Sequence, residues 1–127
     1  MAYVLTSETM PQIAGRYIRS REGGRAVYVR QGGAFPAFMY RWDEGHDEHR
    51  GWWVGPEVGS EQVWAYNPKT LHLPPRVGWM LSPGDDTGLV QDESTCVRSS
   101  ERNEFKSGAR EPYIFKTDLA TSLNLLL

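Results

Sequence analysis

Closely spaced glycines and prolines constrain this chain more than any other feature of its sequence. There are 13 Gly and 8 Pro in 127 residues, and seven of the prolines fall between residues 11 and 83. Turn signals in that stretch recur about every 8 to 12 residues, which is typical of short antiparallel strands. No segment before residue 84 keeps the apolar period of a helix over three turns, because Pro and Gly interrupt it. The spacing therefore predicts an all-β fold.

Strand-like segments lie between these breaks. They cover residues 13–19, 25–30, 37–42, 51–55, 62–66 and 77–81. In the third segment, alternation places Phe38, Tyr40 and Trp42 on one face of the sheet, with Met39 and Arg41 on the other. We predict a small antiparallel sheet or partly open barrel of about five or six short strands, followed by an irregular C-terminal extension.

The composition changes near residue 84. All five Trp lie between Trp42 and Trp79, whereas residues 84–127 contain no Trp and are rich in polar and charged residues. We therefore expect an N-terminal arm at 1–10, a Trp-rich antiparallel β domain at 11–84 and a polar extension at 85–127. The extension contains a candidate strand at 112–116 and a candidate Leu-rich helix at 118–126. It could dock on its own domain or on a partner.

Charge and cysteine content narrow the class of protein. The formal net charge is −2 and there is one Cys, so the chain has no general attraction for nucleic acid or anionic lipid and no internal disulfide. No stretch approaches the ~20 apolar residues of a membrane helix, and the N-terminus lacks the pattern of a signal peptide. These features predict an intracellular, cytoplasmic protein that binds neither nucleic acid nor membranes. Nothing in the sequence indicates a cofactor.

Several short motifs follow one another in a fixed order. Gly15-Arg16-Tyr17 and Gly24-Arg25-Ala26-Val27-Tyr28 come first, and Gly51-Trp52-Trp53-Val54-Gly55-Pro56, Val63-Trp64-Ala65-Tyr66 and Pro74-Pro75-Arg76-Val77-Gly78-Trp79 follow. This order resembles a short Trp-rich β module found alone or attached to other domains in many protist and algal proteins. The resemblance covers residues 15–79. It implies a compact, non-catalytic accessory domain and transfers no catalytic residue.

Aromatic residues are the strongest functional signal. Adjacent Trp52 and Trp53 must face opposite sides of a strand, so one can fill the core while the other lies on the opposite face. Trp is suited to ligand binding because it offers a large rigid surface and an N–H donor. The candidate ligand-binding face consists of Trp52, Trp53, Trp64, Tyr66 and Trp79. The alternative is that most of these rings form the core, because the chain is poor in aliphatic residues.

A loop between residues 43 and 50 concentrates His and acidic residues. His46, Asp47 and His49 are weak candidates for a metal site, since imidazole and carboxylate groups are ordinary metal ligands. Their spacing does not match the helical H-E-x-x-H signature, and Gly45 disfavours a helix. A solvated polar loop explains the same composition, so we predict no metal.

Three functions are compatible with these observations. The first is a non-catalytic binding module whose aromatic face takes a protein or peptide, with carbohydrate as a further ligand class. The second is a structural subunit of a larger assembly, held by its C-terminal extension. The third is a metal-dependent enzyme at the loop of His46, Asp47, Glu48 and His49. Because no paired acid and base, nucleophile motif or phosphate loop is evident, we expect the first.

Overall fold

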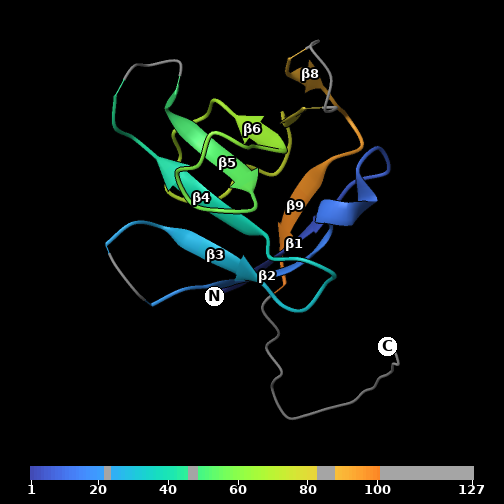
Figure 1. Ribbon diagram of the computed structural model, residues 1–127, viewed down its shortest axis with the longest axis horizontal. Coiled ribbons are helices and arrows are strands. Elements are labelled where there is room, and N and C mark those ends of the chain that lie inside the picture. The colour runs from blue at the N-terminus through green and yellow to red at the C-terminus, as the bar shows by residue number, and fades with distance from the viewer. Residues whose placement is uncertain (22–23, 46–48, 83–87, 101–127) are drawn as a thin grey trace.

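The computed structural model describes residues 1–21, 24–45, 49–82 and 88–100 (Figure 1). These residues form one antiparallel sheet of nine short strands, with a 3₁₀ turn at Pro11–Ile13. The strands are β1 Ala2–Thr6, β2 Gly15–Arg19, β3 Val27–Arg30, β4 Phe38–Trp42, β5 Gly51–Gly55, β6 Ala65–Asn67, β7 Met80–Leu81, β8 Val90–Gln91 and β9 Cys96–Ser99. The predicted all-β, antiparallel class is confirmed, whereas the number of strands exceeds the five or six expected.

The sheet is a meander with one long return. Strands β1 to β7 each pair with the next strand along the chain, which leaves β8 at one edge, and β9 pairs with β1 to form the other edge. Figure 1 shows the sheet curled into a half-barrel, with β3, β4 and β5 crossing the direction of β9 at a steep angle. The curl brings Trp79, which precedes β7, into the same apolar cluster as Val97 of β9. The core therefore fills the inside of the curl.

The N-terminal segment differs from expectation. Residues 1–10 were expected to form an arm outside the domain, but they contain β1, which lies between β2 and β9. Tyr3 and Leu5 of this strand are buried in the core. The strand forms because a short apolar, β-branched run has partners on both sides, and the partner β9 comes from the far end of the described chain.

The expected boundary at residue 85 also differs from the structure. Strands β8 and β9 lie beyond it and belong to the same sheet as the Trp-rich segment. Val97 contributes to the core, and its backbone N–H also bonds to the carbonyl of Arg76. The domain therefore extends at least to Ser99. The candidate strand at 112–116 and helix at 118–126 lie outside the described residues.

Aromatic rings build much of the core. Trp52 and Trp79 are 0% exposed, and Tyr17 and Tyr28 pack into the same cluster with Leu5, Ile13, Met39 and Val54. Each buried ring that carries a polar atom needs a hydrogen-bond partner. The indole N–H groups of Trp52 and Trp79 donate to the carbonyls of Leu71 and Pro75, both at 2.9 Å. Backbone carbonyls in loops thus satisfy the polar edges of the core rings.

One buried cation lies at the C-terminal end of the central strand β3. Arg30 is only 9% exposed, and its guanidinium donates to the carbonyls of Gln12 and Phe35 at 2.6 Å each. Its guanidinium carbon also lies 5.0 Å from the centre of the Phe35 ring. Because its partners are backbone oxygens of the 3₁₀ turn and of the loop between β3 and β4, Arg30 holds both segments against the sheet. Within the described part of the chain, no helix is long and apolar enough to cross a membrane.

Candidate functional site

A row of aromatic side chains crosses the face of the sheet opposite the core. The strand register aligns Tyr40 of β4 with Trp53 of β5, and Trp53 with Tyr66 of β6. Paired residues on antiparallel strands lie on the same face, so all three rings share the outer face. The rings of Trp53 and Tyr66 stack with their centres 4.1 Å apart at 34°. This contact orients the half-buried Trp53 indole on the outer surface.

The polar atoms of Trp53 and Tyr66 bond to the two residues that precede β5. The Trp53 indole N–H donates to the carbonyl of His49 at 3.0 Å, and the Tyr66 hydroxyl donates to the carbonyl of Arg50. Both rings therefore have their orientation fixed at two points, by stacking and by a hydrogen bond. Such fixed rings lose little conformational freedom when a ligand binds.

The segment that follows β5 covers one side of this face. Gly59 has a φ of +76°, a conformation that favours glycine, and an added Cβ would lie 3.2 Å from the Trp42 ring. The close approach places the segment against Trp42, whose ring is 6.4 Å from that of Tyr40 at 77°. Trp42 is half-buried as a result.

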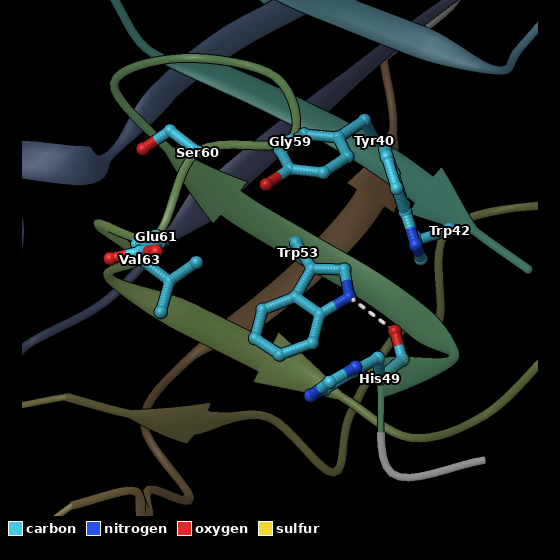
Figure 2. Close-up of a pocket in the computed structure, with 8 residues that line it drawn as sticks. All are labelled: Tyr40, Trp42, His49, Trp53, Gly59, Ser60, Glu61 and Val63. Atoms are coloured by element: carbon cyan, nitrogen blue, oxygen red, sulfur yellow. Dashed lines mark hydrogen bonds between the residues drawn. The ribbon is translucent and has the colours of Figure 1, made fainter. Parts of the chain in front are cut away.

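These elements enclose the aromatic pocket, a cavity of about 390 Å³. Figure 2 shows the Trp53 indole face-on at its centre, with Tyr40 and Trp42 on one side, His49 on another, and Glu61 with Val63 on a third. Gly59 and Ser60 complete the described lining. The volume lies in the range of small-ligand and side-chain pockets. The pocket is thus mainly aromatic, with Glu61 as its one carboxylate among the described lining residues.

The phenols of the site are protonated at neutral pH. Burial raises the pKa of Tyr40, although the backbone of Gly59 hydrogen-bonds to its phenol and the nearby Arg25 charge acts in the same opposing direction. Burial also raises the pKa of Tyr66. Both hydroxyl groups therefore remain neutral, and the aromatic row carries no negative charge of its own.

The structure divides the five residues predicted to form one aromatic face. Trp53 and Tyr66 stack on the outer face, whereas Trp52 and Trp79 lie fully inside the core. Trp64 is half-buried and packs against Phe35, with ring centres 5.4 Å apart. The reason is the alternation of the strands, which sends Trp52 inward and Trp53 outward. Only Trp53 of the five lines the aromatic pocket.

Other pocket residues were absent from the predicted set. Tyr40 and Trp42 line the pocket beside Trp53, and Glu61 supplies its charge. The alternation along residues 37–42 already placed Tyr40 and Trp42 on one face, and that signal could have identified them. No sequence signal pointed to Glu61, because its position depends on how the segment after β5 crosses the sheet.

The predicted His-rich loop is described in part. His49 is exposed and lines the aromatic pocket, while His46 and Asp47 lie outside the described residues. No group of three or more His, Cys, Asp or Glu able to hold a metal ion occurs among the residues with described positions. Cys96 is a half-buried free thiol beside the Thr6 hydroxyl.

Comparisons with known proteins found no relatives. No family model, no curated protein and no solved structure matches the chain.

Proposed function

We propose that this protein is a non-catalytic binding module that takes a protein or peptide segment at the aromatic pocket. The main support is the pair of half-buried indoles of Trp42 and Trp53, which line a cavity of about 390 Å³ on the face opposite the core. Large rigid rings around a cavity are typical of peptide and side-chain recognition.

Preorganisation is the second argument for this function. Trp53 is held by the Tyr66 ring and the His49 carbonyl, and Trp42 is in contact with Gly59. The core does not require these outer rings, since Trp52 and Trp79 already occupy the inner face. A ring that is oriented but only half-buried can still bury further surface against a ligand, which favours binding.

A peptide-display selection tests the proposal directly. Random 12-residue peptides are selected against the full chain, and the selected peptides are then titrated into ¹⁵N-labelled protein. We expect the indole N–H signals of Trp42 and Trp53 to shift, while those of Trp52, Trp64 and Trp79 remain in place. This readout uses the wild-type chain and does not depend on any variant folding.

A matched pair of variants provides the second arm. Trp42→Ala removes a half-buried indole from the pocket, and Trp64→Ala removes a half-buried indole outside it. Peptide affinity should fall at least tenfold for Trp42→Ala and stay within twofold for Trp64→Ala. Failure to select any peptide, or selected peptides that shift other indoles, would contradict the proposal. Binding of glycans alone on an array would replace the peptide with a carbohydrate ligand.

A further inference from the structure

The rings around the aromatic pocket favour a positively charged guest. The faces of Trp and Tyr rings are electron-rich and attract cations within about 6 Å of the ring centre. This chain already shows such a contact, because the guanidinium carbon of Arg25 lies 4.0 Å from the centre of the Trp42 ring. Arg25 lines a neighbouring hollow with Val58 and Glu44 and is not part of the pocket lining.

The charge of the pocket also favours a positively charged guest. Glu61 is exposed and is the only acidic side chain among the described lining residues. The charge of Arg25 is balanced by the carboxylate of Glu44, at 2.8 Å. A cation entering the pocket therefore meets the Glu61 carboxylate and the half-buried rings of Trp42 and Trp53, with the buried Tyr40 ring in the pocket wall.

Apart from the Glu61 carboxylate, the lining offers few acceptors for a primary ammonium. Ser60 is engaged with Gln62, whose backbone N–H donates to its hydroxyl at 2.9 Å, and the Tyr40 phenol is engaged with the Gly59 backbone. A lysine ammonium has three N–H donors and is strongly hydrated, so it needs acceptors to replace lost water. A trimethylammonium group keeps the charge and has no N–H donor to satisfy.

We propose that the aromatic pocket binds the quaternary ammonium of a trimethylated lysine in a partner protein, held by Tyr40, Trp42, Trp53 and Glu61. This inference rests on the proposed function and specifies the side chain that the pocket takes. The ring faces attract the delocalised charge, and Glu61 adds a longer-range attraction without a direct hydrogen bond.

Three small probes that differ only at the side-chain end test the inference. They are the N-acetyl, N′-methylamide derivatives of trimethyllysine, of lysine, and of the neutral carbon analogue in which a tert-butyl group replaces the trimethylammonium. Each is titrated into the ¹⁵N-labelled full chain. We expect saturable shifts of the Trp42 and Trp53 indole signals with trimethyllysine, and affinities about 5- to 30-fold weaker for both other probes.

Two carboxylate variants provide the matched control. Glu61→Gln removes the pocket charge, and Glu57→Gln removes an exposed charge from the same segment outside the described lining. Glu61→Gln should weaken trimethyllysine binding about three- to tenfold and leave the neutral analogue unchanged. Glu57→Gln should change neither affinity more than twofold. Both carboxylates are exposed, so we expect both variants to fold.

Specific outcomes would overturn the inference. Equal affinity for the neutral analogue would show an apolar pocket, and tighter binding of unmodified lysine would show that hydrogen bonding dominates. Binding to phosphatidylcholine vesicles would show that the quaternary ammonium recognised by the pocket belongs to a lipid headgroup rather than to a protein. If display-selected peptides shift Trp42 and Trp53 but trimethyllysine does not displace them, the proposed function stands and this inference fails.

Discussion

The adjacent tryptophans of β5 provide the sharpest test of the fold, because they differ in burial but not in chemistry. Trp52 is fully buried, and its indole N–H donates to the carbonyl of Leu71. Truncating a buried Trp to Ala costs about 3–5 kcal/mol of stability through lost burial and the cavity left behind. The Leu71 carbonyl also loses its donor, so we expect the Trp52→Ala cost to lie near the upper end.

The corresponding cost for Trp53→Ala is smaller. Its ring contact with Tyr66 contributes about 0.5–1.5 kcal/mol, and partial burial of the indole adds about 1 kcal/mol. The hydrogen bond to the His49 carbonyl is exposed, so water replaces the lost donor at little cost. We therefore expect Trp53→Ala to destabilise the protein by about 2 kcal/mol, roughly half the effect of Trp52→Ala.

Urea denaturation followed by far-UV circular dichroism measures both values. With a slope of about 1.5 kcal/mol per molar urea, Trp52→Ala should lower the midpoint by about 3 M and Trp53→Ala by about 1.3 M. Domains are commonly stable by only about 5–15 kcal/mol, so Trp52→Ala could leave the chain unfolded in buffer while Trp53→Ala stays folded. Equal midpoints, or a larger loss for Trp53→Ala, would refute the assignment of the two faces.

Three further predictions concern groups whose environment the structure defines. Burial raises the pKa of Tyr17 above its ordinary value, so this phenol ionises at lower pH in the unfolded chain and stability falls above about pH 10. Tyr17→Phe should therefore flatten the decline in Tm at alkaline pH, and a decline as steep as that of the wild type would contradict this role of Tyr17. Hydrogen bonds from Thr9 and Thr95 lower the pKa of Asp92, so the contribution of this carboxylate to stability is present above about pH 4 and is lost as the pH falls further. Asp92→Asn should therefore reduce the acid-induced drop in Tm, whereas a drop equal to that of the wild type would contradict this prediction. Arg30→Met leaves two loop carbonyls without donors and should cost about 2–4 kcal/mol in urea denaturation; a midpoint equal to wild type would contradict the loop-holding role.

Local sequence signals predicted the middle of the sheet well. Gly and Pro delimit β5, and the predicted segment 51–55 coincides with the observed strand. The segments predicted at 25–30 and 37–42 contain β3 and β4 with small differences at their N-terminal ends. These strands pair with their sequence neighbours, so turn spacing and alternation carry most of the information that defines them.

The strands β1 and β9 could not be predicted from local sequence, because each pairs with a segment that is distant in the chain. β9 pairs with β1 across about 90 residues, and Cys96 lies opposite Thr6 in this register. Local periodicity contains no information on such a pairing, so a polar segment such as 96–99 was expected to be part of an irregular extension. β1 was missed for the same reason, although its Tyr-Val-Leu run has high strand propensity.

The candidate site was predictable only in part, because alternation separates residues into two faces without saying which face is covered. Trp52 and Trp53 were correctly expected on opposite sides, but the choice between core and surface required the curl of the whole sheet. The sequence alone did not place Trp79 in the core, because its position there depends on the loop at Pro75, whose carbonyl accepts from the indole N–H. Glu61 entered the site through the path of the segment after β5, which the sequence does not define.

The hydrogen bonds of the indole N–H groups explain why the Trp42 indole can still donate a hydrogen bond to a ligand. In the core, Trp52 and Trp79 donate to loop carbonyls, and on the outer face Trp53 does the same with His49. The rings thus fix the loops, which allows a domain poor in aliphatic residues to hold its turns in place. Trp42 and Trp64 depart from this arrangement, because no hydrogen bond of either indole N–H occurs within the described structure. Of these two, Trp42 lines the pocket, and the neighbouring Arg25 and Tyr40 side chains hold its ring. Its orientation therefore uses up none of its hydrogen-bonding capacity, and a backbone carbonyl of a bound peptide can accept from it while the ring face contacts the guest side chain.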